Sequence, residues 1–118
     1  MPTYVELHAH SCFSLLDGAS APEALVKQAA LLKMSALALT DHDALYGAVR
    51  FDRAAQTVGV CPIFGAELTL VGGHHLTLLV ENEQGWQNLC WLVSRARHNA
   101  PKGNAALPSD AFDGHTGG

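Results

Sequence analysis

Histidine and carboxylate side chains occur at the ends of three strands that the sequence predicts. In parallel α/β proteins the carboxyl ends of the strands meet at one edge of the sheet, and functional side chains gather there. Three consecutive strands that deliver the same kinds of side chain to one edge therefore predict a shared site. Its candidate members are His8, His10, Asp17, Asp41, His42, Asp43 and Glu67.

The spacing of the first two histidines indicates metal binding. Side chains alternate between the faces of a strand, so we expect His8 and His10 on one face and Ala9 on the other. Imidazole and carboxylate ligands together suit Zn²⁺, Mn²⁺ or Fe, whereas sites made only of oxygen suit Mg²⁺ or Ca²⁺. A carboxylate such as Glu67 can bridge two cations, which together can activate a water and stabilise an oxygen displaced from phosphorus. These residues predict a metal-dependent phosphoesterase.

Each motif taken alone also has an ordinary structural explanation. A single His-x-His pair at a strand end is weak evidence for a metal ion. Asp41 or Asp43 can simply cap the helix that follows, and Glu67 can be a solvated carboxylate. Their joint occurrence at three strand ends is what favours the metal site.

Strands and helices alternate along the predicted chain. Ser20 and Glu23 have capping-box spacing, Gly59 is a plausible left-handed helix end, and Asn82 can cap the last long helix. The alternation predicts a parallel α/β sheet, either open or closed into a barrel. A complete eight-unit barrel takes about 250 residues, so this chain would supply about half of one. The predicted elements are strands over 4–8, 36–40 and 61–68, helices over 21–33, 45–57 and 83–98, two extended segments over 69–80 around Gly72-Gly73, and a short helix near 108–114.

Composition narrows the class of protein. The 118 residues fit one domain or a fragment of a larger one, and the formal net charge of −4 gives no overall basic footprint for nucleic acid. No apolar run reaches the roughly 18 residues of a membrane span, and no signal peptide is visible. Cys12, Cys61 and Cys90 lack paired spacing, which is typical of reduced thiols. We expect a cytoplasmic protein with no membrane partner.

Three stretches carry a resemblance to a known family. "ELHAHSCFSLLDG", "ALTDHDALYGAVRF" and "PIFGAEL" resemble the PHP (polymerase and histidinol phosphatase) family. The continuation "HHLTLLVENEQGWQNLCWLVSRARHNAPKG" resembles the N-terminal PHP domain of bacterial C-family DNA polymerases, the polymerase III alpha subunits. It is closer to the error-prone alpha paralogue than to the replicative one.

The resemblance implies a distorted seven-stranded (β/α) barrel, related to the TIM barrel, with up to three divalent metals. His8 and His10 match the first ligands, and Glu67 matches a bridging carboxylate with a catalytic role. Asp17 and His42 match ligands of another metal. His75 matches a further ligand, although His74 is its neighbour and a plain hairpin would place His75 some distance from Glu67. Asp41, the second catalytic candidate, would orient His42.

The resemblance also implies what this chain lacks. The later family ligands, a His or Cys and a final Asp-x-His, have no counterpart, nor has the polymerase core. We therefore expect residues 1–100 to be the N-terminal half of a PHP domain and 101–118 a linker or the truncated start of the next βα unit. The implied partners are the rest of the polymerase chain, DNA, and a second fragment paired through an exposed strand edge.

Three functions remain open at this point. The parent domain would be a metal-dependent phosphoesterase or a 3′–5′ proofreading exonuclease, with the fragment alone inactive. It would alternatively be a metal-stabilised structural module, or a stand-alone amidohydrolase-like or histidinol-phosphatase-like enzyme. Arg95, Arg97 and Lys102 form a small basic cluster, explained either by the helix C-terminus or by contact with phosphate.

Overall fold

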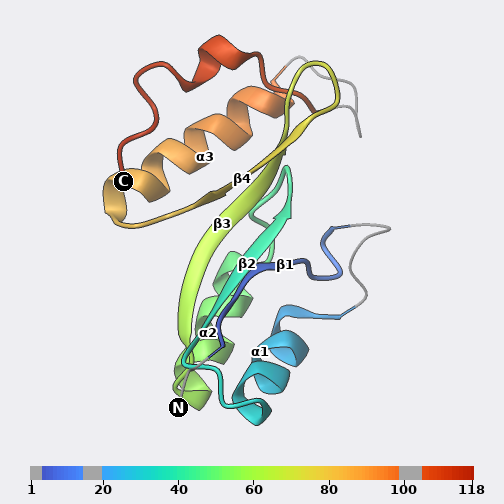
Figure 1. The fold of residues 1–118 in the computed structure, drawn as a ribbon, viewed down its shortest axis with the longest axis vertical. Coiled ribbons are helices and arrows are strands. Elements are labelled where there is room, and N and C mark those ends of the chain that lie inside the picture. Colours follow the sequence, from blue (N-terminus) through green and yellow to red (C-terminus); the bar gives the residue numbers. More distant parts are fainter. Residues whose placement is uncertain (1–3, 15–19, 99–104) are drawn as a thin grey trace.

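One sheet of four strands, in the order β1-β2-β3-β4, forms the centre of the computed structural model (Figure 1). β1, β2 and β3 are parallel, and β4 is antiparallel to β3. The structure describes residues 4–14, 20–98 and 105–118. The elements are β1 (Glu6–Ala9), α1 (Pro22–Leu31), β2 (Ala36–His42), α2 (Ala48–Val58), β3 (Cys61–Thr69), β4 (His75–Leu79), α3 (Glu83–Arg97) and the 3₁₀ helix η1 (Ser109–Phe112).

Two hydrophobic cores hold the helices to the sheet. α1 and α2 pack beside one half of the sheet and α3 beside the other half (Figure 1). Each core buries apolar side chains, which is the main favourable contribution to folding. The first core contains Val26, Ala29, Leu37, Leu39, Phe51, Ala55 and Val60, and the second contains Ala66, Leu68, Leu89, Leu92, Ala96, Leu107 and Ala111.

The predicted element types are confirmed, with shifts at their ends. α2 ends at Gly59, whose φ of 77° is left-handed as expected. Asn82 caps α3 by accepting a hydrogen bond from the backbone N of Gly85. The second strand extends to His42, beyond the predicted limit of 40. His42 therefore belongs to the strand itself, where register fixes its direction.

The predicted capping box at the start of the first helix is wrong. The N-cap of α1 is Ala21, and no side chain caps it. Glu23 instead accepts hydrogen bonds from Arg50, with Arg50 Nε 2.6 Å from Glu23 Oε1. The reason is that α2 packs beside α1 and supplies a cationic partner, which the sequence spacing of Ser20 and Glu23 does not reveal.

The C-terminal residues pack against the rest of the fold. Leu107 donates its backbone N–H to Thr69 O at 2.9 Å and its side chain is buried in the second core. Ala111 of η1 belongs to the same core. No helix in the described ranges is long and apolar enough to cross a membrane.

Gly65 lets β3 and β4 approach closely, and we expect Gly65→Ala to destabilise the protein. An added Cβ would collide with the backbone O of Leu78 and press against Leu79 and Thr40. Backbone cannot move aside like a flexible side chain, so the two strands would have to separate. Overpacking of this kind costs about 2 kcal/mol of unfolding free energy. Urea denaturation monitored by circular dichroism measures the loss, and an unchanged midpoint would contradict the close approach.

Candidate metal centre

Glu67, near the end of β3, lies at the centre of four histidines. Its Oε1 contacts Nε2 of His8 and lies 3.2 Å from Nε2 of His10. Its Oε2 lies 2.9 Å from Nδ1 of His75 and 3.3 Å from Nδ1 of His42. Each carboxylate oxygen therefore serves a different pair of imidazoles. Glu67 itself is only 6% exposed.

The strands place these side chains through register and alternation. His42 and Glu67 are direct partners in the parallel β2–β3 pair, so both point to the same face of the sheet. His8 lies in β1, the strand on the other side of β2, and His10 directly follows that strand's end. The expectation that the carboxyl ends of three strands deliver these residues to one edge is met in the structure.

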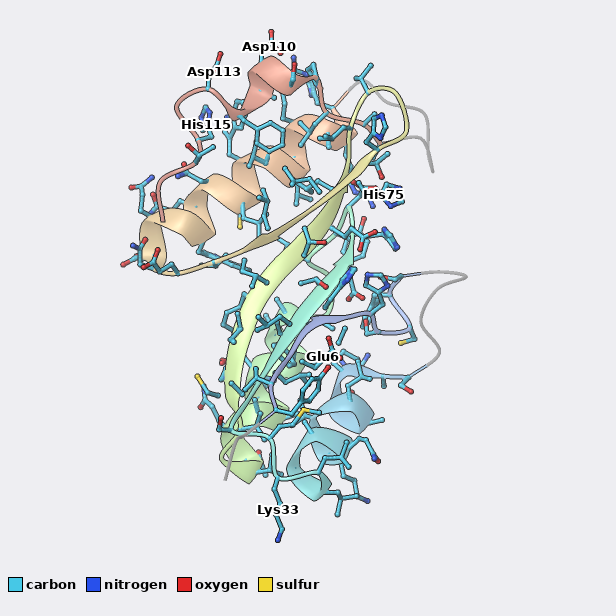
Figure 2. All side chains as sticks on the ribbon, viewed as in Figure 1. Glu6, Lys33, His75, Asp110, Asp113 and His115 are labelled. Carbon is cyan, nitrogen blue, oxygen red and sulfur yellow. The ribbon has the colours of Figure 1, made fainter. Side chains whose placement is uncertain are left out.

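His75 joins the cluster, although we expected a hairpin to keep it away from Glu67. That expectation is wrong because of the register: Glu67 pairs with Thr77, and His75 pairs with Thr69. His75 is then the diagonal neighbour of Glu67 on the same face, a relation that lets long side chains touch. The hairpin itself is as predicted, with left-handed φ values of 102° and 88° at Gly72 and Gly73. Figure 2 labels His75 among nitrogen- and oxygen-tipped side chains near this end of the sheet.

Two groups of candidate metal ligands share Glu67. One consists of His8, His10 and Glu67, and the other of His42, Glu67 and His75, with ligand atoms within 4.8 Å of one another in each group. His75 belongs to these groups and His74 does not. The rings form a continuous row, with centroids 5.0, 4.4 and 5.3 Å apart from His8 through His10 and His42 to His75. Imidazole nitrogens around one carboxylate fit divalent Zn, Mn or Fe.

The electrostatics keep Glu67 ionised. Partial burial raises its pKa, but the hydrogen bond from His8 and the charges of His42, His10 and His8 lower it more. The net pKa lies below the ordinary glutamate value. A carboxylate that is already deprotonated at neutral pH can bind cations without first losing a proton.

Asp41 contacts the loop after β1. Its Oδ1 accepts hydrogen bonds from Ser11 N at 2.6 Å and Ser14 Oγ at 2.7 Å, and its Oδ2 accepts from Ser11 Oγ at 2.7 Å. The side chains of adjacent strand residues point to opposite faces, and the orienting role of Asp41 toward His42 stays a prediction. Ser14 links Asp41 to His42 indirectly, because its Oγ accepts a hydrogen bond from the backbone N of His42 at 2.9 Å.

Sequence reasoning missed the structural role of Ser11 and Ser14. Both residues are buried: Ser11 is completely inaccessible to solvent, and Ser14 is 2% exposed. The sequence did offer a signal. The two serines come one and four residues after His10, and a buried carboxylate such as Asp41 needs hydrogen-bond donors. Asp17, the other ligand predicted from this loop, lies outside the described residues.

Ser14→Ala should weaken the hydrogen bonding between the loop after β1 and strand β2. The substitution removes a donor to Asp41 and leaves the His42 N–H without its described acceptor. An unsatisfied buried group costs about 2 kcal/mol, and we expect that loss of unfolding free energy in metal-free protein. Chemical denaturation in EDTA measures it. Ser94→Ala, on the exposed side of α3, is the matched control and should change little.

Comparison with known proteins identifies the class. The family model described as the PHP domain matches residues 6–116, a range that contains all five residues of the His–Glu cluster. The chain belongs to the PHP domain family, as its motifs predicted.

Its curated relatives include error-prone DNA polymerases. The chain is 56% identical to the error-prone DNA polymerase of Symbiobacterium thermophilum over 80% of its own length and 9% of the relative's. It is 45% identical to that of Mycobacterium tuberculosis over 98% of its own length and 12% of the relative's. The chain thus spans about a tenth of the length of these relatives, which are much larger proteins.

Solved structures give the same fold. A protein from Bifidobacterium adolescentis, assigned as a metal-dependent phosphoesterase, is 25% identical with a TM-score of 0.62, covering 82% of this chain and 34% of its own. An amidohydrolase from Chromobacterium violaceum is 28% identical with a TM-score of 0.63, covering 80% and 33%. The predicted partial (β/α) barrel of PHP type is confirmed.

Proposed function

We propose that this chain is the N-terminal half of the PHP domain of an error-prone-type DNA polymerase and that it binds catalytic divalent metals. Its ligands would be His8, His10, Glu67, His42 and His75. Asp17 remains a proposed ligand from the sequence. The parent domain would hydrolyse phosphoesters as a 3′–5′ exonuclease acting on DNA in the cytoplasm.

The observation that supports this proposal is the two-sided environment of Glu67. A carboxylate whose two oxygens face separate imidazole pairs is the arrangement of a bridging ligand. Two bound cations would activate a water and stabilise a leaving oxygen on phosphorus. The chain's own contribution is to hold the imidazoles by strand register and to fix the loop after His10 through Asp41.

A structural role is the second candidate. The proposed ligands come from all four strands and from His10, which directly follows β1. Bound metal would therefore also stabilise the sheet. The rest of a longer polymerase chain, or a second copy paired along an edge strand, would then complete the module. β1 and β4 are the edge strands that such a copy could pair with.

Metal analysis combined with a hydrolysis assay separates these candidates. We expect the purified chain to retain divalent metal after dialysis, measured by plasma mass spectrometry. Full-length polymerase should then release nucleotides from a 3′ end, and the release should stop with EDTA. Metal without hydrolysis would support the structural role, while absence of metal would contradict both.

A further inference from the structure

Arg97, the last residue of α3, is anchored to Asp43, the residue that directly follows His42. Its Nε donates a hydrogen bond to the backbone O of Asp43 at 2.7 Å, across 54 residues of sequence. Its guanidinium carbon lies 5.4 Å from the centroid of the Tyr46 ring, within the range of a cation–π contact. Two contacts to the turn after β2 therefore hold an exposed cationic side chain in place.

Asp43 connects Arg97 to the ligands. It directly follows His42 and donates its backbone N–H to Glu67 O at 2.9 Å. Its carboxylate accepts from Thr69 N at 2.8 Å and Thr69 Oγ1 at 2.7 Å, and its φ of 49° is the left-handed conformation that turns the chain here. Arg97 is thus anchored to a residue that is bonded to two strand ends of the site.

The Arg97 guanidinium has N–H donors that no described hydrogen bond uses. A guanidinium carries five N–H groups, and the described hydrogen bonds of Arg97 use only the one on Nε. No ion pair joins Arg97 to a carboxylate in the described part of the chain, whereas Arg50 is paired with Glu23. A planar cation with unused donors matches a phosphate group in shape and charge.

We propose that Arg97 binds a backbone phosphate of a nucleic-acid strand whose neighbouring phosphodiester lies at the metal centre. This inference rests on the proposed phosphoesterase function. It also separates Arg97 from Arg95, which the sequence placed in the same basic cluster: Arg95 makes no described contact to the turn after β2. Because Arg97 is already anchored, it would lose less side-chain entropy on binding than a free arginine.

The test measures how a fluorescein-labelled oligothymidylate binds to the chain in EDTA, where no cleavage occurs. We expect Arg97→Gln to weaken binding about fivefold at low salt and to reduce the slope of log affinity against log salt by about 0.7, the value for one lost phosphate contact on a single strand. Arg95→Gln is the matched control and should leave the slope unchanged. Equal slopes for the two variants would overturn the proposal.

Three further measurements test the alternatives to phosphate binding. Arg97→Lys retains the positive charge but not the planar guanidinium group. Its circular dichroism melt should match that of the native chain, which would show that the substitution leaves the fold intact. Metal content should be unchanged in Arg97→Gln. In full-length polymerase, the same substitution should raise KM for an oligonucleotide but not for bis(p-nitrophenyl) phosphate, which has no second phosphate. Equal effects on both substrates would contradict the assignment, whereas absence of metal in every variant would contradict the proposed function alone.

Discussion

Glu67→Gln should abolish metal binding at both positions with one substitution. Both ligand groups contain this carboxylate, and Glu67 is the only acidic member of either group. Glutamine preserves the shape of the side chain but removes the charge that binds and bridges cations. Since loss of supporting residues alone costs 10–100-fold in metal affinity, we expect the loss of this ligand to cost about 100-fold or more. Isothermal titration with Zn²⁺ or Mn²⁺ measures the affinity.

The design has an internal control in the histidines. His75→Ala removes a member of one ligand group and leaves His8, His10 and Glu67 in place, so roughly half of the metal should remain. Glu83→Gln, exposed at the start of α3, should have no effect on binding. Full metal stoichiometry in Glu67→Gln would rule out its role as the shared ligand.

Asp41→Ala should have the largest effect on stability. The side chain is 2% exposed and accepts three hydrogen bonds, from Ser11 N, Ser11 Oγ and Ser14 Oγ. The substitution leaves three buried donors without their charged acceptor, and each such loss costs about 1–3 kcal/mol. Allowing for relaxation of the loop, we expect the unfolding free energy to fall by about 4 kcal/mol. Urea denaturation in EDTA isolates this effect from any contribution of metal.

Asp52→Ala provides the comparison for Asp41. Asp52 lies on α2, where it accepts a hydrogen bond from Gln56 at the exposed surface. Its loss should change the unfolding free energy by less than about 0.5 kcal/mol. Similar values for the two aspartate variants would mean that the Asp41 network does not support the loop.

The sequence was sufficient to predict which residues lie at the strand ends. It was insufficient to predict the pairing register that brings their side chains together. His8, His10, His42 and Glu67 could be found because strand periodicity and parallel topology determine which ends meet. His75 could be named only by resemblance, since its approach to Glu67 depends on the exact β3–β4 register. Neither hydrophobic pattern nor turn residues specify that register to within one pair of residues.

Side-chain partners were harder to predict than elements. Glu23 has helix-capping spacing in the sequence but binds Arg50 across the space between two helices. Asp41 accepts hydrogen bonds from Ser11 and Ser14 in the loop after β1, and the sequence analysis predicted neither contact. The anchoring of Arg97 by Asp43 joins residues from α3 and the turn after β2. Such contacts depend on how helices pack, which local sequence does not encode.

The single carboxylate between two imidazole pairs has a thermodynamic consequence. An ion bound by His8 and His10 would share the Glu67 carboxylate with an ion bound by His42 and His75. Occupancy of one position should therefore change the metal affinity of the other, and by linkage the change would be equal in both directions. Titration curves should not fit two independent sites. The order in which two different metals are added would alter the path to the filled state but not its free energy.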